Sequence, residues 1–308
     1  MNELRHVIEA QQFDRDLLES IFSVTKEMED VVSHYGSNIL QRRIMATLFY
    51  EPSTRTRLSF ESAMHRLGGA VITTESARMF SSAAKGETLE DTIRILEGYA
   101  DVIVLRHFES GSARRAADVA NVPIINAGDG PGQHPTQALL DLYTIKKEIG
   151  RLDDISVAMV GDLANGRTAR SLAYLLARYS NVRIHFVAPR VVRMKQDIKD
   201  YLTRHNIFWQ ETEDLRDVVQ SADVVYQTRI QKERFADRTE DYLAAKGRYI
   251  IDRPLLELLP ETGIVMHPLP RVDEISKEVD SDPRCAFFRQ AHNGLYVRMA
   301  LLKTLLVN

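Results

Sequence analysis

The chain has 308 residues, of which 44% are hydrophobic and 27% are charged, and its formal net charge is −3. This length is enough for two ordinary domains, each with its own hydrophobic core. The near balance of charges gives no global basic field, so we expect no nucleic-acid partner and only a local site for any anion. Cys285 is the single cysteine, which excludes an internal disulfide and a cluster of thiolate metal ligands.

The N-terminal segment has no apolar core of the kind found in signal peptides. Residues 1–15 are polar and of mixed charge, and the spacing of Leu17, Ile21, Val24 and Met28 then predicts an amphipathic helix. No apolar run approaches the ~20 residues that a membrane-spanning helix needs. We therefore expect a cytoplasmic protein with no membrane partner. A mature organellar form that has lost its transit peptide would show the same pattern.

Strand-like runs then alternate with helical patterns along almost the whole chain. The predicted strands are Ile44–Tyr50, Ala70–Thr74, Val102–Leu105, Val122–Asn126, Ile155–Val160, Val182–Val187, Asp223–Thr228, Tyr249–Asp252 and Ile264–Met266. This alternation predicts an α/β protein in which mostly parallel sheets are flanked by helices. A polar break at 150–154 predicts a boundary between two domains, residues 1–150 and 151–287. A last helix from about Gln290 to Val307 could pack on either half.

The stretch from Phe49 to Arg57 is the strongest indication of function in the chain. An apolar strand stops at Pro52, and hydroxyl and guanidinium groups follow it at the start of a predicted helix, with Ser53 or Thr54 as its N-cap. Backbone N–H groups at a helix start, the hydroxyls and Arg55 together predict a site for phosphate or another compact anion. A capped helix with surface arginines is the simpler alternative, but a cap needs only one hydroxyl.

Further side chains suited to anions also follow predicted strands, where ligands bind in sheets of this type. They are Arg106, His134, Arg167, Arg229 and His267. The segment from Gly161 to Thr168 is a near miss to the P-loop, with Arg167 where that motif has lysine. An arginine fork suits a carboxylate, because the two groups form a bidentate pair. A nucleotide-binding switch stays open as an alternative.

Other features of the sequence favour catalysis by placement. There is no H-E-x-x-H, G-x-S-x-G or C-x-x-C motif, and no carboxylate pair stands out as an acid/base dyad. Orientation of two reactants can supply ~7–11 kcal/mol, which suffices best when one substrate is already activated. Two prolines in the stretch from His267 to Arg271 would hold the carbonyls of Pro268 and Leu269 fixed, as acceptors for an ammonium or amide. The segment around Lys85 indicates, from its spacing alone, a plain exposed loop.

These motifs resemble, in their order along the chain, the catalytic chain of the aspartate carbamoyltransferase family. They are Phe49 to Arg57, Lys85 to Thr88, His134 to Gln137, Gly166 to Thr168, Thr228 to Gln231 and His267 to Pro270. The resemblance implies a carbamoyl-phosphate domain, an aspartate domain and a final helix, residues 288–308, that packs back on the first domain. It also implies transfer of the carbamoyl group of carbamoyl phosphate to the α-amine of L-aspartate, an early step of pyrimidine biosynthesis, with no metal and no other cofactor.

The resemblance assigns roles to individual residues. Carbamoyl phosphate would be held by Ser53, Thr54, Arg55, Thr56, Ser81, Lys85, Arg106, His134, Gln137, Pro268 and Leu269. Aspartate would be held by Lys85, Arg167, Arg229, Gln231 and Leu269. The catalytic residues would be Arg55, Thr56, Lys85, Arg106 and His134, and Glu51 and Arg234 would take part in domain closure. Ser81 and Lys85 would come from the adjacent subunit of a homotrimer, which reverses the interpretation of this segment as a plain loop. The resemblance leaves open whether a regulatory chain attaches.

The ornithine carbamoyltransferase family is the alternative, because it shares the Ser-x-Arg-Thr-Arg phosphate motif. That family typically has His-Cys-Leu-Pro where this chain has His267 to Pro270. Arg167 and Arg229 supply cations for the two carboxylates of aspartate, whereas the ornithine ammonium beside Arg229 would meet a like charge that costs several kcal/mol. These residues predict aspartate as the second substrate.

Overall fold

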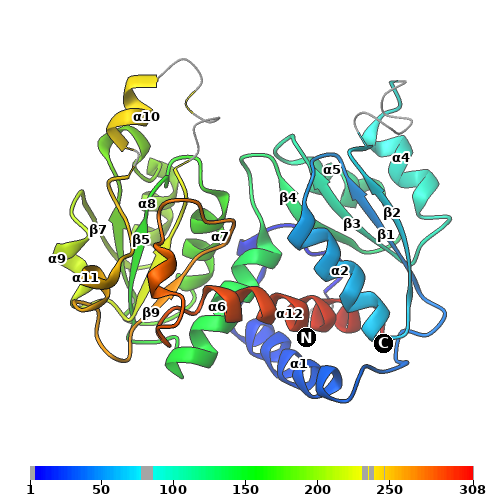
Figure 1. Ribbon diagram of the computed structural model, residues 1–308. Coiled ribbons are helices and arrows are strands. Elements are labelled where there is room, and N and C mark those ends of the chain that lie inside the picture. The colour runs from blue at the N-terminus through cyan, green and yellow to red at the C-terminus, as the bar shows by residue number, and fades with distance from the viewer. Residues whose placement is uncertain (1–3, 78–85, 231–234, 236–238, 246, 308) are drawn as a thin grey trace. The chain divides into compact units, whose positions relative to one another are not determined.

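The computed structural model describes residues 4–77, 86–230, 235, 239–245 and 247–307. The chain forms two compact units: unit 1 is Met1–Leu139 with His292–Asn308, and unit 2 is Leu140–Ala291. Each unit contains one parallel sheet with helices packed against it (Figure 1). The predicted α/β class with two mostly parallel sheets is confirmed. Among the helices in the described ranges, none has the length and hydropathy needed to cross a membrane.

The sheet of unit 1 has four parallel strands in the order β2-β1-β3-β4. They are β1 (Ile44–Phe49), β2 (Ala70–Glu75), β3 (Val102–His107) and β4 (Ile124–Asp129). The helices of this unit include α1 (Arg15–Ser33), α2 (Thr54–Arg66), α4 (Leu89–Leu96) and α5 (Ser112–Val119). Successive apolar residues of β3, Val102 to Leu105, are all buried. Such a run, without polar alternation, is typical of a parallel strand covered on both faces.

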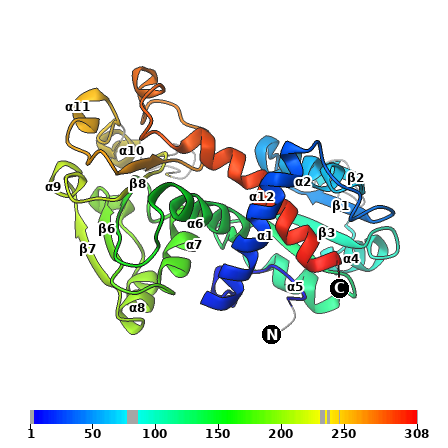
Figure 2. The ribbon, with the colours of Figure 1, turned by 90° about the horizontal axis from the view of Figure 1, so that it is seen from below.

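The C-terminal helix α12 (Phe287–Leu306) brings its later residues into unit 1. Figures 1 and 2 both show this part of the helix beside α1 and α2. The Lys303 Nζ lies 2.6 Å from a carboxylate oxygen of Glu27 in α1, and the Arg298 guanidinium lies 5.2 Å from the ring centre of Phe60 in α2. The predicted return of the final helix to the first domain is confirmed.

The sheet of unit 2 has five parallel strands in the order β7-β6-β5-β8-β9. They are β5 (Ser156–Val160), β6 (Arg183–Val187), β7 (Phe208–Thr212), β8 (Val224–Gln227) and β9 (Ile264–Met266). The helices along this part of the chain include α6 (Pro135–Ile149), α7 (Arg167–Leu176), α8 (Gln196–Arg204), α9 (Arg216–Val219), α10 (Thr239–Ala245) and α11 (Arg253–Leu256). One hydrophobic cluster packs α9 and α11 against Ala158 and Val160 of β5, which closes one face of the sheet.

In unit 2 the sequence analysis missed one strand, and one of its predicted strands is wrong. Residues 208–212 form the edge strand β7, which the sequence did not reveal because half-exposed and polar residues dominate it; Phe208 itself is 52% exposed. The apolar run Tyr249–Asp252 is no strand: it makes a single bridge, between Ile251 and Ile275. The extended run ends because Asp252 accepts a hydrogen bond from the Leu255 backbone N–H and so caps α11.

The division between the units falls inside α6, between Leu139 and Leu140. The sequence predicts it after this helix, at residue 150, where the polar break occurs. A helix that crosses from one unit to the other carries no composition change at the crossing, so the two criteria differ. The predicted domain limits, 1–150 with 288–308 and 151–287, stay a prediction.

Candidate substrate-binding site

Each sheet has one topological switch point, where later strands are added on the other side of the first strand. In unit 1 this point lies between β1 and β3, and in unit 2 it lies between β5 and β8. Ligands of open parallel sheets bind at such points, because the loops leave the two strands in opposite directions and open a crevice. The residues predicted to bind anions lie there: Ser53 to Thr56 after β1, Arg106 near the end of β3, Arg167 after β5 and Arg229 after β8.

The N-terminus of α2 forms the first part of the candidate site in unit 1. Ser53 is the N-cap, as predicted, but its side chain makes no capping hydrogen bond, so its hydroxyl is not committed to the helix. Its backbone N–H donates to Glu75 Oε1 at 3.2 Å. Thr54 and Arg55 open the helix and Thr56 is buried in its first turn. N–H groups and the helix dipole together favour an anion at this end of α2.

Arg106 faces the same crevice from the end of β3. Its Nη2 lies 3.5 Å from a Glu51 carboxylate oxygen, and its Nη1 donates to the Ala127 carbonyl at 3.4 Å. The pKa of Arg106 is lowered from its ordinary value, mainly because the guanidinium is buried. The Glu51 carboxylate opposes this shift, and the charge of the nearby Arg55 adds to it. The two guanidinium groups are close enough to repel each other, and that of Arg106 is desolvated. A bound anion would offset both costs, so the pair favours an anion site.

Arg57 belongs to the same motif but is held by carboxylates instead. Its guanidinium lies 3.1 Å from Glu61 and 3.1 Å from Glu75, and it also donates to the Thr73 hydroxyl at 3.3 Å. These pairs tie α2 to the edge strand β2. Arg57 is therefore a structural residue, whereas Arg55 and Arg106 remain the arginines of this region that are predicted to bind the ligand.

The loop between β4 and α6 brings His134 and Gln137 to the carboxyl end of the same sheet. The Asp129 carboxylate accepts from the Gly111 N–H at 2.9 Å and the Gln133 N–H at 2.7 Å, which fixes the loop. His134 is 4% exposed and comes directly before Pro135, the first residue of α6. Its Nδ1 lies 3.3 Å from the Thr136 hydroxyl. A buried imidazole in this position can donate from its other nitrogen to a carbonyl oxygen.

The candidate site in unit 2 is built around the close approach of two loops. Gly161, after β5, has a φ of +111°, and a Cβ there would lie 2.3 Å from the Thr228 carbonyl oxygen after β8. Only glycine allows both this conformation and this contact. Asp162, 1% exposed, accepts from the Asn165 N–H at 3.1 Å and shapes the turn into α7. Arg167, the first residue of α7, is thereby placed on the same crevice as the loop that carries Arg229.

The segment after β9 is fixed by a histidine and a carboxylate. The Leu269 N–H donates to His267 Nδ1 at 2.7 Å, so Nε2 carries the proton and donates to Glu274 Oε1 at 2.8 Å. Burial alone would raise the pKa of Glu274, but hydrogen bonds from His267 and Val272 bring that pKa below its ordinary value. These hydrogen bonds tie the backbone from His267 to Leu269 to Glu274.

Four residues of the predicted site cannot be placed, and the structure adds residues that the sequence did not single out. Ser81, Lys85, Gln231 and Arg234 lie outside the described residues. The added residues are three acids in turns or apolar helices: Asp141, Asp162 and Glu274. An acid within an apolar run, as in Ala-Leu-Leu-Asp141-Leu-Tyr, was the signal that could have revealed one of them.

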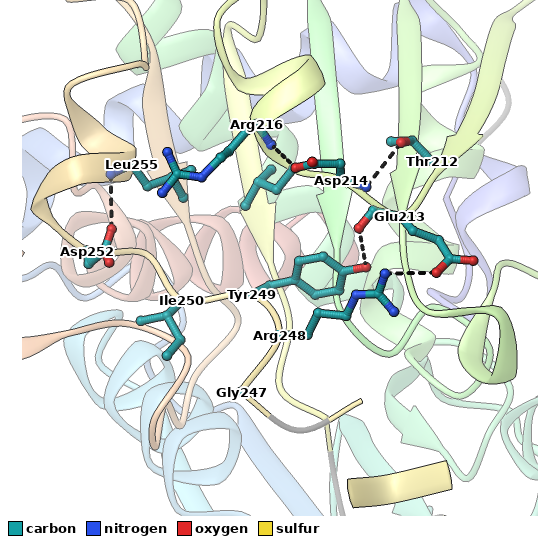
Figure 3. Close-up of a pocket in the computed structure, with 11 residues that line it drawn as sticks. Thr212, Glu213, Asp214, Arg216, Gly247, Arg248, Tyr249, Ile250, Asp252 and Leu255 are labelled. Carbon is teal, nitrogen blue, oxygen red and sulfur yellow. Dashed lines mark hydrogen bonds and ion pairs between the residues drawn. The ribbon is translucent and has the colours of Figure 1, made fainter. Parts of the chain in front are cut away.

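A pocket of about 550 Å³ lies elsewhere in unit 2, after β7 (Figure 3). The residues predicted to bind substrate do not line it. Its polar groups pair with each other: Arg248 lies 2.9 Å from Glu213, and the Tyr249 hydroxyl donates to the Glu213 carbonyl at 3.0 Å. Burial raises the pKa of Tyr249 to about 12, so it remains a donor. This pocket lies at a sheet edge, away from the switch point, and its charges indicate no particular ligand.

Comparison with known families gives the class of protein that this fold and site define. The family model of the aspartate/ornithine carbamoyltransferase carbamoyl-P binding domain matches residues 5–147. The model of the Asp/Orn binding domain of the same enzymes matches residues 153–305. Together the two models cover nearly the whole chain.

Individual relatives narrow this class. The chain is 66% identical to the chloroplastic aspartate carbamoyltransferase of Arabidopsis thaliana over 306 residues, which cover 99% of this chain and 78% of the relative. It is 50% identical to the aspartate carbamoyltransferase catalytic subunit of Methanocaldococcus jannaschii over 304 residues, 98% of either chain. A crystal structure of the Trypanosoma cruzi enzyme with carbamoyl phosphate and aspartate has a TM-score of 0.93 at 43% identity and covers 98% of this chain and 97% of its own. The chain therefore belongs to the aspartate carbamoyltransferase family.

These relatives overturn one expectation. The prediction of a cytoplasmic protein is wrong, because the plant relatives that are 65% or 66% identical to this chain over the aligned residues are chloroplastic enzymes. Composition could not reveal this, since the balance of charges and the single cysteine suit any aqueous, reducing compartment. Location depends on an address read by a receptor, not on the physical chemistry of the folded domains.

Proposed function

We propose that this chain transfers the carbamoyl group of carbamoyl phosphate to the α-amine of L-aspartate, giving N-carbamoyl-L-aspartate and phosphate. The observation that carries the proposal is that both crevices at the switch points hold the cations that two anionic substrates need. The relative from Trypanosoma cruzi, similar over 98% of this chain, binds these two substrates. Small-molecule substrates of this class need no extended binding surface.

In this proposal, the candidate site in unit 1 binds carbamoyl phosphate. Ser53, Thr54, Arg55 and Thr56 bind the phosphate together with Arg106, because N–H groups, hydroxyls and guanidinium groups match its oxygens. Three donors then polarise the carbamoyl carbonyl: Thr56, Arg106 and His134. Gln137 contacts the carbamoyl nitrogen.

The candidate site in unit 2 binds aspartate. Arg167 and Arg229 pair with its two carboxylates, and Gln231 adds a further contact. The backbone at Pro268 and Leu269 contacts both substrates through carbonyl oxygens, which suits the amide of one and the amine of the other. Glu51 and Arg234 take part in domain closure.

The chemistry is a displacement at the carbamoyl carbon. The neutral α-amine of aspartate attacks this carbon and forms the new C–N bond, while charge develops on the carbonyl oxygen. Thr56, Arg106 and His134 donate to that oxygen, and donors of this kind each contribute about 10²–10³-fold to turnover. The C–O bond to phosphate then breaks, Arg55 and Lys85 stabilise the departing phosphate, and the phosphate takes the amine proton.

A two-substrate assay tests the proposal. The purified protein is supplied with carbamoyl phosphate and either L-aspartate or L-ornithine, and the carbamoylated product is measured. We expect turnover with aspartate only, since an ammonium beside Arg229 is repelled. Turnover with ornithine alone would assign the chain to the sister reaction, and magnesium-dependent nucleotide binding without carbamoyl transfer would favour a P-loop-like switch.

We further propose a homotrimer whose sites are shared, with Ser81 and Lys85 contributed by the adjacent subunit. Exposed apolar residues of unit 1 support a subunit contact near this segment. Ile72 lies on the edge strand β2 before the segment, and Ile95 and Tyr99 lie on and after α4, which follows it; they are 40%, 47% and 60% exposed. Exposed apolar side chains of this kind favour a contact with another subunit.

Subunit mixing tests the shared site. The Lys85→Ala and Arg55→Ala variants are expected to be inactive alone, because each removes a cation from every site. Dissociated and reassembled together, they should regain activity, since some mixed sites receive both intact residues. No recovery in mixtures that light scattering shows to be trimers would contradict a shared site.

A further inference from the structure

A buried carboxylate lies at the centre of unit 2, in the helix α6. Asp141 is 0% exposed. Its Oδ2 accepts from the Tyr226 hydroxyl at 2.7 Å, and its Oδ1 accepts from Gln290 Nε2 at 2.6 Å. Because both oxygens accept hydrogen bonds, the group has the arrangement of an ionised carboxylate. A charge removed from water is costly, so its retention here calls for a role.

One branch from Asp141 leads to the two arginine-bearing segments. Tyr226 lies in β8, three residues before Arg229, and is fully buried. Its hydroxyl also shares a hydrogen bond with the side chain of Thr168, the neighbour of Arg167 at the start of α7. Tyr226 gives its only proton to Asp141, so Thr168 is the donor in that bond. Burial, followed by the Asp141 charge, raises the pKa of Tyr226 well above its ordinary value, which keeps it a donor.

The second branch leads to the segment after β9. Gln290 is 1% exposed, and its Oε1 accepts from the His267 backbone N–H at 2.8 Å. The His267 ring in turn accepts from the Leu269 N–H and donates to Glu274. The chain of contacts therefore runs from Asp141 to the backbone predicted to touch both substrates.

We propose that Asp141 is a positioning residue that couples the three segments which hold aspartate: the start of α7, the loop after β8 and the loop after β9. This inference rests on the proposed function. The carboxylate accepts both hydrogen bonds only when the side chains of Tyr226 and Gln290 are correctly placed relative to each other. Tyr226 is also hydrogen-bonded to Thr168 in α7, and Gln290 to the His267 N–H after β9. Because hydrogen bonds in a low-dielectric interior are directional and strengthen each other, a shift in one segment is transmitted to the others.

The Asp141→Asn variant tests this role with almost no change in shape. An amide offers one acceptor where the carboxylate offers two, so one of the donors from Tyr226 and Gln290 loses its partner. We expect the KM for aspartate to rise at least about tenfold, which corresponds to about 1.4 kcal/mol. The Kd for inorganic phosphate, measured by calorimetry, should change less than about twofold, because the phosphate-binding residues belong to unit 1.

The matched control is Asp223→Asn, at the opposite ends of the same strands. The Asp223 carboxylate accepts from the Ser156 N–H and from Arg151, at 2.8 Å each, and ties the amino ends of β8 and β5. This variant should lower the unfolding temperature and leave the KM for aspartate unchanged. If Asp141→Asn does the same, its carboxylate has only a structural role and the inference is overturned.

A second variant keeps the test decisive if Asp141→Asn fails to fold. Tyr226→Phe cuts the branch to β8 and α7 and leaves Asp141 bonded to Gln290, and it should raise the KM for aspartate in the same direction. An unchanged KM in this variant overturns the inference while the wild type remains active. Absence of aspartate carbamoylation by the wild type would instead reject the proposed function itself.

Discussion

Replacing Arg106 with methionine should separate function from stability at the predicted phosphate site. Methionine keeps the apolar stem of the side chain but removes the guanidinium. Arg106 donates a long hydrogen bond, 3.4 Å, to the Ala127 carbonyl and lies 3.5 Å from Glu51, whose side chain is 35% exposed. An ion pair of this kind contributes only ~0.2–1 kcal/mol. The Arg106 Nε is buried and makes no hydrogen bond to any described residue, so its removal offsets part of that loss. We expect the free energy of unfolding to change by less than about 1 kcal/mol.

The effect on turnover should be much larger. Removal of one donor from a developing oxyanion typically costs about 10²–10³-fold in kcat, or about 2.7–4 kcal/mol. Carbamoyl aspartate formation measures this loss, and denaturant unfolding measures stability. Phosphate at about 100 times its Kd should stabilise the wild type by about 2.7 kcal/mol, and the variant far less.

Arg57→Met is the matched control for this experiment. Arg57 lies in the same motif but pairs with Glu61 and Glu75, so its loss leaves two carboxylates without their cation. This variant should lose more stability and less activity than Arg106→Met. The reasoning would be refuted if Arg106→Met lost about 3 kcal/mol of stability and less than tenfold in kcat.

Three further predictions concern unit 2. Arg229→Ala should raise the KM for aspartate by about 30-fold or more, since a lost charge pair costs at least about 2 kcal/mol; unchanged aspartate saturation would contradict the assignment. Although burial opposes the shift, hydrogen bonding from His267 lowers the pKa of Glu274 below its ordinary 4.5. The pair therefore stabilises the folded state above that pH and contributes less as the pH falls. Glu274→Gln should therefore flatten the acid limb of the thermal stability curve, and an unchanged limb would reject the pairing. Burial raises the pKa of Cys285 to about 11, so about one thiol in a thousand is ionised at pH 8. Iodoacetamide should label it far more slowly than in the urea-unfolded chain, and equal rates would argue against its burial.

The sequence was sufficient where the pattern is local. Buried parallel strands are uninterrupted apolar runs, so β1, β3, β5 and β9 were found near their true limits. The motif after β1 also predicts an anionic ligand from local sequence, because a strand end, hydroxyl groups, an arginine and a helix start follow each other in the chain. The edge strand β7 escaped notice because solvent, not a neighbouring layer, covers much of its surface.

Only the tertiary structure decided which of the candidate residues act together. The strand order places the ends of β1 and β3, and of β5 and β8, next to each other, although the paired segments are about fifty residues or more apart in sequence. The tertiary contacts also distinguish Arg106 from Arg57. Arg106 lies 3.5 Å from one carboxylate, that of Glu51, whereas Arg57 lies 3.1 Å from each of two, those of Glu61 and Glu75. A pattern along the chain records which side chains are present and how they are spaced. Which charge is neutralised by which neighbour depends on distances of a few ångströms across the fold, because electrostatic and hydrogen-bond energies are set by those distances.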